Sequence, residues 1–566
     1  MSKNIEIADI FDKIADALEF KGDNSFRIGA YRKAARILRE YPEDIEELYK
    51  RNEIQKISGI GKGMAEKIIE YLTTGKMKKY EEATENIPEE LLKMLEIPNL
   101  GPKTLNLAYT KLGVRTLQDL ERVIENGQLA NLFGMGEKKV ENIKRGIELY
   151  KQGKERIPLG IAFPIVEEII EELKKYTDKI EPAGSLRRMR ETIGDIDILA
   201  TGKNIEIINS FISLPSVKEV LAKGDTKASV IVKTNNLQVD LRVVSSDSFG
   251  AALQYFTGSK SHNIKLRGLA KDKGLKISEY GVFKGDEKIA GRCEEEVYKA
   301  LGLVWIPPEL REDRGEIEAA MENKLPILIE GKDIKGDLHV HSKYSDGVET
   351  IEEIAVAGKK MGYEYIGICD HSKTSKIAGG LDEETLKRRN EEIDRINEKI
   401  KGIKILKGME VDILSDGSLD YPDKILEKLD FVIASIHQGF KKNVTERVKK
   451  AIENPYVDII AHPTGRLLSG REGYEIDIDE IIEYASKFNV VLEINCYPDR
   501  LDLNDVNIIK AKSKNVKFSL GTDAHNIGML KYIKFGLGMA KRGWLTKKDI
   551  LNTYKWEEMP LRRRIR

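Results

Sequence analysis

The chain has little cysteine and no apolar run of membrane-spanning length. Its three cysteines, Cys293, Cys369 and Cys496, are widely spaced and form no C-x-x-C pair, so neither a disulfide framework nor a cysteine-based zinc module is expected. The first twenty residues are amphipathic and acidic, unlike a secretory signal. Together with the missing apolar run, this composition predicts a cytoplasmic protein that does not bind membranes.

An excess of either charge is also lacking. The chain carries 94 Lys and Arg against 94 Asp and Glu, which gives a formal net charge of zero. This balance argues against a protein that coats nucleic acid along its whole surface, so any such contact must be local. At 566 residues the chain is longer than one hydrophobic core usually supports, and we expect three or four domains.

A glycine-containing turn recurs three times within residues 1 to about 150, where helical periodicity prevails. The three copies are ISGIGKGMAEKI (57–68), IPNLGPKTLNLA (97–108) and LFGMGEKKVENI (132–143). Each resembles the helix-hairpin-helix motif, whose turn points backbone N–H groups at a DNA phosphate. The resemblance implies DNA contacts at Gly59, Gly61, Gly63, Gly101, Gly134 and Gly136. An ordinary turn between packed helices is the alternative for one copy, but three copies at similar spacing favour the motif.

The middle copy departs from this pattern. Asn99 stands where its first glycine belongs. Asparagine tolerates a positive φ, so we expect the turn to survive while its phosphate contact is in doubt.

Three carboxylates stand out after residue 157, where strands begin to alternate with helices. In IEPAGSLRRMRETIGDIDILATG (180–202), a Gly-Ser turn opens a helix, and Asp195 and Asp197 then begin an apolar strand. Alternate residues of a strand share a face, so both carboxylates point the same way. A second strand, LQVDLRVV (237–244), adds Asp240. A lone D-x-D is usually an exposed strand end, but three converging carboxylates predict two Mg²⁺ or Mn²⁺ ions for in-line phosphoryl transfer.

This set of residues resembles the nucleotidyltransferase superfamily, and QYFTGSKSHNIKLR (254–267) is similar to the nucleotide-binding segment of family X DNA polymerases. The resemblance covers most of residues 1–318 and implies that gapped or nicked double-stranded DNA and dNTPs are the substrates. It implies that Asp195, Asp197 and Asp240 are catalytic metal ligands, with Asp240 taking the proton of the primer 3′-hydroxyl. The nucleotide-binding residues that it implies are Gly184, Ser185, Arg188, Gly194, Tyr255, Phe256, Gly258 and Asn263, with Arg267 on the DNA.

The N-terminal helical region resembles the lyase domain of the same family. Lys67 falls at the position of the lysine that forms a Schiff base with the sugar of an abasic site. Such a lysine needs a pKa lowered by burial or neighbouring cations. An ordinary surface lysine is the alternative, and DNA binding by this region does not depend on the outcome.

Six of the seven histidines lie after residue 336, and each follows a predicted strand. Together with three carboxylates at equivalent positions, the set comprises His339, His341, Asp346, His371, Glu410, His437, His462, Asp523 and His525. In a barrel of parallel strands these ends meet at one face. A single such histidine is more often a core or loop residue, but six in succession predict a site for two or three metal ions.

Residues 334–566 resemble the PHP (polymerase and histidinol phosphatase) domain, and the nine residues match its metal-ligand pattern. The resemblance implies phosphoester hydrolysis with Mn²⁺, Zn²⁺ or Fe²⁺. The polymerase motifs upstream favour a DNA substrate, so we expect a 3′-5′ exonuclease or a phosphoesterase that acts on 3′-ends or abasic sites. The alternatives are a phosphatase for a small molecule of the histidinol-phosphate kind and a domain with a purely structural role. Arg466 and Arg500 are candidates for contacting a substrate phosphate.

The predicted protein is a multidomain, monomeric DNA repair polymerase that fills short gaps. Its predicted fold combines an all-α N-terminal region, an α+β nucleotidyltransferase palm with a small α/β subdomain, and a distorted (βα)7 TIM-like barrel. The predicted domains are 1–85 (lyase-like), 86–155 (fingers-type, DNA-binding), 156–246 (palm), 247–318 (nucleotide and nascent pair), 319–333 (linker) and 334–566 (PHP).

Overall fold

The chain divides into two units, residues 1–155 and 156–566, and each has its own hydrophobic cores. The computed structural model describes residues 3–40, 45–57, 59–85, 87–95, 97, 100–132, 134–136, 139–141, 143–144, 146–147, 156–470 and 473–562. No helix in these ranges is both long enough and apolar enough to cross a bilayer.

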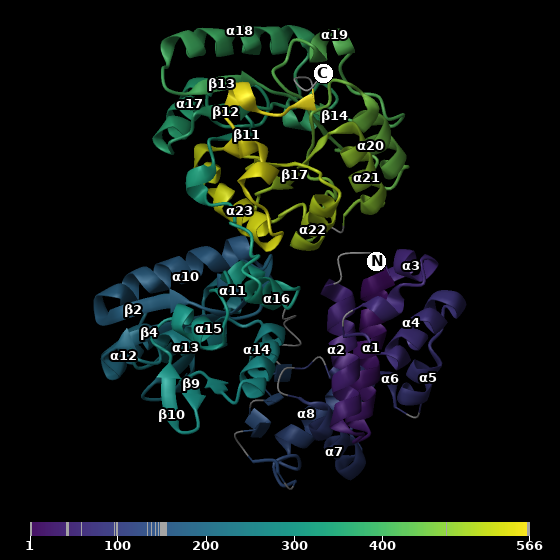
Figure 1. The fold of residues 1–566 in the computed structure, drawn as a ribbon, viewed down its shortest axis with the longest axis vertical. Coiled ribbons are helices and arrows are strands. Elements are labelled where there is room, and N and C mark those ends of the chain that lie inside the picture. Colours follow the sequence, from purple (N-terminus) through teal and green to yellow (C-terminus); the bar gives the residue numbers. More distant parts are fainter. Residues whose placement is uncertain are drawn as a thin grey trace. The chain divides into compact units, whose positions relative to one another are not determined.

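The first unit is helical (Figure 1). Its elements are α1 (Lys3–Phe20), α2 (Ser25–Glu40), α3 (Ile45–Lys50), η1 (Ile54–Lys56), α4 (Lys62–Thr74), α5 (Lys78–Thr84), α6 (Glu89–Met94), α7 (Pro102–Leu112) and α8 (Leu117–Glu125). Helices α1 and α2 pack side by side, and Phe11 meets Tyr31 edge to face with ring centroids 5.6 Å apart. Such pairs add to the stability that apolar burial supplies.

The first two glycine turns start helices as their sequences predict. Gly61 and Gly101 are the N-cap residues of α4 and α7. Gly59 and Gly134 adopt positive φ angles of 86° and 79°, a region that favours glycine. A Cβ on Gly59 would also lie 2.6 Å from the side chain of Ile37. Asn99 lies outside the described residues.

A five-stranded sheet, in the order β2-β4-β7-β6-β5, begins the second unit. The elements here are β1 (Ile157–Pro158), α10 (Leu159–Leu173), η2 (Lys174–Tyr176), β2 (Thr177–Pro182), α11 (Gly184–Arg187), β3 (Thr192–Ile193), β4 (Ile196–Gly202), α12 (Asn204–Ile212), β5 (Val217–Lys223), β6 (Lys227–Val232), η3 (Thr234–Asn236) and β7 (Gln238–Val243). Strands β4 and β7 are parallel, and the other neighbours are antiparallel.

The two faces of this sheet differ. In β4, Ile196 and Ile198 join the hydrophobic core that contains residues of α10 and α12. Leu199 packs instead with residues of the helix α13 (Phe249–Thr257). Because side chains alternate along a strand, Asp197 lies on the same face as Leu199. The carboxylates of the sheet are therefore directed away from the main core.

A small mixed segment follows the sheet. It contains α13, α14 (Lys260–Asp272), β8 (Lys276–Ser278), β9 (Gly281–Lys284), β10 (Glu287–Ala290), α15 (Glu294–Ala300), η4 (Pro308–Leu310), α16 (Glu316–Met321) and η5 (Gly331–Asp333). The stretch 319–333, which the sequence predicts to be a linker, contacts the C-terminal part of the chain. Its Ile329 is fully buried and donates its backbone N–H to the carbonyl of Leu545 at 3.1 Å.

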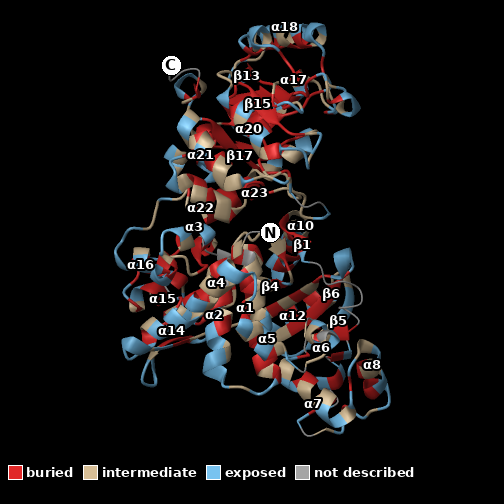
Figure 2. Cartoon of the chain, turned by 90° about the vertical axis from the view of Figure 1, so that its right-hand side faces the viewer, coloured by how far each residue is buried: buried red, intermediate tan, exposed pale blue. Residues whose placement is uncertain are grey.

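Parallel strands and helices alternate through the rest of the chain. The elements are β11 (Gly336–Val340), α17 (Ile351–Lys360), β12 (Tyr365–Ile368), η6 (Lys376–Ala378), α18 (Glu383–Lys399), β13 (Lys404–Lys407), β14 (Glu410–Asp412), α19 (Asp423–Leu426), β15 (Ile433–Ser435), α20 (Val444–Glu453), β16 (Ile459–Ile460), α21 (Ile478–Phe488), β17 (Val491–Asn495), α22 (Asp505–Ser513), β18 (Phe518–Gly521), η7 (Ile527–Tyr532), α23 (Ile533–Arg542), η8 (Lys547–Asp549), η9 (Leu551–Thr553) and η10 (Trp556–Glu558). Strands β15 and β17 are buried throughout (Figure 2).

The parallel strands form two sheets, in the orders β11-β12-β13 and β14-β15-β16-β17-β18. Two isolated parallel bridges join the sheets, one between Val340 and Ala524 and one between His371 and Glu410. All strand pairs in both sheets are parallel, so the strands share one direction. Their C-terminal ends therefore lie on a common side.

Candidate active sites

Strands β4 and β7 place two of the three palm carboxylates side by side on one face of the sheet. Asp197 and Asp240 are register partners in the parallel pair, and Asp195 precedes β4 by one residue. Asp240 accepts hydrogen bonds from Gln238 Nε2 at 3.0 Å and pairs with Lys227 Nζ at 3.2 Å. These contacts hold the pKa of Asp240 below its usual value although burial opposes them.

Asp197 has the opposite electrostatic character. Burial, followed by the like charges of Asp195 and Asp240, raises the pKa of its carboxyl to about 7. Three carboxylates in this arrangement repel one another, and divalent cations would relieve that repulsion with the oxygen ligands that Mg²⁺ prefers. The donor set therefore fits the two metal ions predicted from the sequence.

The Gly-Ser turn lies directly against Asp197. Gly184 begins α11 with a φ of 62°, and a Cβ at this position would lie 2.6 Å from Asp197 Oδ2. Ser185 follows in the first turn of this short helix and is half-buried. Only glycine allows both the backbone conformation and the close approach.

Arg188, which the sequence predicts to bind phosphate, is largely buried and forms two hydrogen bonds within the protein. Its Nε donates to Glu312 Oε1 at 3.1 Å, and its Nη1 donates to the carbonyl of Thr257. A second arginine, Arg156, was not singled out by the sequence pattern. Its Nε donates to Thr192 Oγ1 at 3.0 Å, and its Nη1 lies 3.1 Å from the place that a Cβ on Gly194 would occupy. Arg156 thus adds a cation beside the Gly194–Asp195 turn.

The segment from Tyr255 to Arg267 spans two helices. The rings of Tyr255 and Phe256 meet edge to face at 5.1 Å, and the guanidinium of Arg242 lies 4.5 Å from the Phe256 ring centroid. Asn263 Nδ2 donates to the carbonyl of Tyr255 at 2.7 Å. Arg267 is exposed on α14. Asn263 is therefore held against the backbone of the aromatic pair by a hydrogen bond. Arg267 is not part of this group, and its side chain is exposed to solvent.

Gly258 is where this segment approaches Arg188. It ends α13 with a φ of 71°. A Cβ at this position would lie 3.2 Å from Arg188 Nη1. Glycine is favoured here by the backbone conformation, and a Cβ would require the Arg188 side chain to shift slightly.

A basic cavity of about 470 Å³ lies in the first unit. It is lined by Arg27, Ala30, Tyr31, Lys33, Gly59, Gly61, Gly63, Met64, Lys67 and Lys79. Lys67 Nζ donates to the carbonyl of Gly63 at 2.8 Å and lies 5.9 Å from the centroid of the Tyr31 ring. Four of the lining residues are cationic and none is acidic, so this described cavity suits an anionic ligand such as a phosphate.

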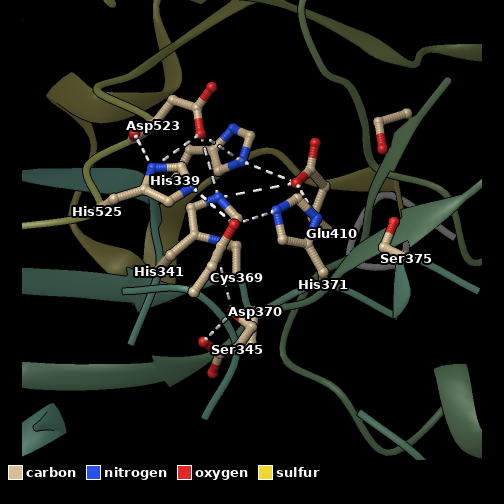
Figure 3. A network of polar contacts seen from close by, with 12 residues as sticks. His339, His341, Ser345, Cys369, Asp370, His371, Ser375, Glu410, Asp523 and His525 are labelled. Atoms are coloured by element: carbon tan, nitrogen blue, oxygen red, sulfur yellow. Dashed lines mark hydrogen bonds and ion pairs between the residues drawn. The ribbon is translucent and has the colours of Figure 1, made fainter. Parts of the chain in front are cut away.

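The structure brings the nine residues of the predicted second site together. Figure 3 shows His339, His341, His371, Glu410, Asp523 and His525 of this set. The residues form three overlapping groups, and each group could hold a metal ion because its own ligand atoms all lie within 4.8 Å of one another. The groups are His341, Asp346, His371 and His525; His339, His341 and Asp523; and His371, Glu410 and His437. His462 lies outside these groups but contacts Glu410, its Nε2 being 3.1 Å from Oε1.

Glu410 lies at the centre of this cluster. Its carboxylate is 3.0 Å from His371 Nδ1 and 3.3 Å from His437 Nε2. Burial would lower the pKa values of both histidines, but Glu410 and a second carboxylate raise them to about 10 for His371 and about 9 for His437. The carboxylates thus favour positive charge at this position, which protons on the histidines supply in metal-free protein and which a bound cation would supply in their place.

Several buried atoms of the cluster form no hydrogen bond of suitable geometry among the described residues, although His371 Nδ1 and Glu410 Oε2 lie 3.0 Å apart as an ion pair. The atoms without such a bond are His339 Nε2, His341 Nδ1, His371 Nδ1, Glu410 Oε2 and His462 Nδ1. A buried polar atom without a hydrogen-bond partner is costly, and a cluster of such imidazole and carboxylate atoms is typical of metal ligands. The mixture of imidazole and carboxylate donors fits divalent transition metals.

Two further carboxylates support the histidines from behind. Glu493 Oε1 lies 2.6 Å from His339 Nδ1, and its Oε2 accepts the backbone N–H of His462 at 2.8 Å. Asp412 Oδ1 lies 2.6 Å from His437 Nδ1. Such partners orient metal-binding histidines and fix their tautomers. Neither residue was predicted from the sequence, although the position of Glu493 within the apolar strand VVLEIN (490–495) was a signal.

The two arginines proposed to contact a phosphate differ. Arg500 Nε lies 3.6 Å from Asp523 Oδ2, beside the cluster. Arg466 instead donates to Glu191 Oε2 at 2.7 Å and to the carbonyls of Arg500 and Leu501. The guanidinium of Arg466 therefore links Glu191, the residue before β3, to the backbone at Arg500 and Leu501.

The fold and the two sites define a class of protein: a nucleotidyltransferase of the polymerase beta type joined to a PHP hydrolase. Four family models match the chain. They are a DNA polymerase beta thumb (252–312), a helix-hairpin-helix domain (2–77), a SAM-like helix-hairpin-helix tandem (90–148) and a PHP domain (337–496). These matches confirm the helical N-terminal region, the mixed α/β middle and the PHP domain.

The chain is 43% identical over 556 residues to the DNA polymerase/3′-5′ exonuclease PolX of Bacillus subtilis (strain 168). This alignment covers 97% of each chain. It belongs to this PHP-containing group of family X DNA polymerases. A probable phosphatase of Thermoanaerobacter sp. (strain X514) is 34% identical over 232 residues, 38% of this chain and 89% of that protein. DNA polymerase lambda of Rattus norvegicus is 26% identical over 343 residues, 55% of this chain and 56% of that protein.

Proposed function

We propose that the chain is a DNA-directed DNA polymerase that fills short gaps during DNA repair, and that its PHP domain is a metal-dependent 3′-5′ exonuclease. The observation that carries the polymerase proposal is the pairing of Asp197 with Asp240 on adjacent strands, with Gly184 pressed against Asp197. Membership of the PolX group supports both activities. We further propose that the protein acts as a cytoplasmic monomer with the six domains predicted from the sequence.

At the polymerase site, Asp195, Asp197 and Asp240 would hold two Mg²⁺ or Mn²⁺ ions. Bound there, the ions would neutralise the triphosphate and polarise the attacking and leaving oxygens. Asp240, held by Gln238 and Lys227, would accept the proton of the primer 3′-hydroxyl. The Gly184–Ser185 turn would donate hydrogen bonds to the phosphates of a dNTP.

The remaining polymerase residues would surround the substrates. Arg188, Gly194 and Arg156 would complete the phosphate contacts. Tyr255, Phe256, Gly258 and Asn263 would lie along the sugar and base, and the exposed Arg267 would reach the template. In the first unit, the glycine turns at Gly59, Gly61, Gly63, Gly101, Gly134 and Gly136 would bind DNA phosphates on either side of the gap.

At the PHP site, the nine ligands would hold two or three Mn²⁺, Zn²⁺ or Fe²⁺ ions. Bound there, the ions would supply an activated water and neutralise the scissile phosphate. Arg500, beside Asp523, would bind a non-bridging phosphate oxygen. Glu493 and Asp412 would keep His339 and His437 oriented.

We propose that the PHP strands close into the distorted seven-stranded barrel predicted from the sequence. Strands β13 and β14 are separated by two residues and count as one interrupted strand in this arrangement. The bridge between Val340 and Ala524 would join the ends of the ring, and the bridge between His371 and Glu410 would span the interruption. Such closure would bring the ligand-bearing strand ends to one face.

The basic cavity supports a lyase function for the first unit. Arg27, Lys33 and Lys79 would bind the phosphate of an abasic site, and Lys67 would attack its sugar. Borohydride should trap a covalent adduct between abasic DNA and the wild-type protein but not Lys67→Ala. An adduct of equal yield with Lys67→Ala would contradict this role.

Single-site variants test the two main activities. Asp240→Ala should abolish incorporation at a one-nucleotide gap while leaving removal of 3′-terminal nucleotides intact. His339→Ala combined with His341→Ala should do the reverse. Gap filling that survives Asp240→Ala would overturn the polymerase assignment.

The similarity to a probable phosphatase favours a second candidate for the PHP half, namely hydrolysis of a small phosphomonoester. Histidinol phosphate is the substrate that separates the alternatives. Hydrolysis of histidinol phosphate by Asp195→Ala, with no release of nucleotides from labelled 3′-ends, would replace the exonuclease by a small-molecule phosphatase. Full nuclease activity in the double histidine variant would indicate a structural PHP domain.

A further inference from the structure

A buried network of charged side chains connects the polymerase site to the PHP domain. Two of its members, Asp505 at the start of α22 and Arg542 at the end of α23, belong to the C-terminal strand-and-helix segment. The others are Arg188 after α11, and Glu312 and Arg314 after η4. Arg542 and Glu312 are 2% and 3% exposed. Charges buried this deeply are stable only with several hydrogen-bonding partners.

The guanidinium of Arg542 forms hydrogen bonds with several members of the network. Its Nε and Nη2 donate to Asp505 Oδ2 at 3.0 and 2.6 Å. Its Nη1 donates at 2.8 Å both to Glu312 Oε1 and to the backbone carbonyl of Arg188. Asp505 also accepts a hydrogen bond from Arg314 Nη1 at 2.9 Å. One PHP side chain therefore touches both the backbone of Arg188 and the carboxylate that Arg188 binds.

Arg188 is held at three points as a result. Its carbonyl accepts from Arg542, its Nε donates to Glu312 Oε1 at 3.1 Å, and its Nη1 donates to the carbonyl of Thr257. Within the described part of the chain its Nη2 forms no hydrogen bond, and Arg188 lies three residues beyond Ser185 in the Gly-Ser segment. This leaves one edge of the guanidinium for a ligand at the turn.

The charges of the network depend on one another. Burial would raise the pKa of Glu312, but Arg542 and then Arg188 hold it well below its usual range. Glu312 is therefore a carboxylate that fixes Arg188 while Arg542 fixes Glu312. A lysine at position 542 keeps the charge but lacks the planar fork that reaches Asp505, Glu312 and a carbonyl together.

We propose that Arg542 is a positioning residue for the polymerase reaction, through which the PHP domain orients Arg188 toward the triphosphate of the incoming dNTP. The proposal rests on the proposed gap-filling function of the Asp195, Asp197 and Asp240 site. Its consequence is that the PHP domain contributes to nucleotide binding independently of its own metal ligands.

Arg542→Lys in the full-length chain tests this role by steady-state incorporation at a one-nucleotide gap in Mg²⁺. Loss of charged hydrogen bonds to Glu312 and to the Arg188 carbonyl should raise the KM for the dNTP by about tenfold. We expect kcat to change by less than about twofold, because Arg188 is displaced but the carboxylates are not. Glu312→Gln, which keeps the shape of the side chain, should give the same split.

Lys534→Met is the matched control. Lys534 also crosses from the PHP domain to the palm, where its Nζ lies 3.1 Å from both carboxylate oxygens of Glu167, but this exposed pair touches neither Arg188 nor Glu312. Its KM for the dNTP should equal that of the wild type. The Kd for gapped DNA and the exonuclease rate should match the wild type in all three variants.

The outcomes separate the two proposals. If the wild type fills no gap, the proposed function fails. If the wild type fills gaps and both Arg542→Lys and Glu312→Gln keep its KM for the dNTP, the positioning role of Arg542 is overturned. An equal rise in KM for Lys534→Met, or a parallel loss of DNA affinity and kcat in Arg542→Lys, would indicate general distortion of the interface and would also overturn it.

Discussion

At the residue scale, Asp197 shows that the carboxylates which would bind metal lower the stability of the metal-free fold. Its carboxyl pKa is raised from 3.8 to about 7 by burial and by Asp195 and Asp240. In metal-free protein this group favours the folded state fully below about pH 4, and the contribution is lost as the pH rises to about 7. Above that pH, folding must bury an ionised carboxylate, at a cost of roughly 2–4 kcal/mol.

Asp197→Asn should therefore raise the thermal unfolding midpoint of metal-free protein at pH 8.5, because the variant buries no charge. At about pH 4 or below the two proteins should unfold within about 1 °C of each other, since Asp197 is then protonated in both the folded and the unfolded state. Calorimetry in EDTA measures both, with the exposed Asp286→Asn as the control. Added Mg²⁺ should stabilise only the proteins that keep Asp197. A stability difference that is independent of pH would contradict the assigned pKa.

Glu493 tests the support of the PHP ligands. Glu493→Gln keeps the shape of the side chain but removes the charge facing His339 Nδ1 at 2.6 Å. Loss of such a partner lowers metal affinity or activity by about 10–100-fold, so exonuclease activity at limiting Mn²⁺ should fall by that factor. Gap filling should not change. Wild-type Mn²⁺ dependence in Glu493→Gln would remove Glu493 from the site, and Glu398→Gln on the exposed face of α18 is the control.

At the scale of elements, the turn into α11 decides where Asp197 lies. Gly184→Ala meets both a φ of 62° and a Cβ placed 2.6 Å from Asp197 Oδ2, so the carboxylate must shift. A displacement near 1 Å can cost about 100-fold in rate, and we expect gap filling to fall at least that far while the exonuclease persists. Gly285→Ala, with a φ of 60° and open space around it, isolates the backbone effect. Equal activity in the two alanine variants would show that the close approach is unimportant.

The elements that could be predicted from sequence are those with a strong local pattern. The alternation around Asp195, Asp197 and Asp240 predicted their common face, and the histidines at successive strand ends predicted one cluster. The glycine turns predicted helix starts at Gly61 and Gly101 because the turn chemistry is local.

Long-range contacts were not predictable in the same way. Nothing in the sequence near Arg188 indicates that Arg542, 354 residues later, donates to its carbonyl. The interpretation of Arg466 as a phosphate ligand failed to foresee its contact with Glu191 for the same reason. The prolines and charged residues around 305–333 predict a linker, and their pattern does not reveal that Ala320, Ile329 and Asp333 are buried.

At the scale of the whole molecule, two reactions of opposite direction share one chain. One site would add a nucleotide to a 3′-end, and the other would remove one. The ligand sets have no residue in common, so each activity should be removable without the other. A chain with both activities could trim an unsuitable 3′-terminus and then refill the position.

The most direct test uses one DNA, a one-nucleotide gap whose primer ends in a mismatched nucleotide, with dNTPs and Mn²⁺ present. Wild-type protein should shorten the primer and then extend it across the gap. Asp195→Ala should yield only shortened primers, the His339→Ala, His341→Ala protein should leave the primer unshortened, and a mixture of the two should restore the filled product. Shortening by the double histidine variant at the wild-type rate, or the absence of shortening by Asp195→Ala, would contradict the account.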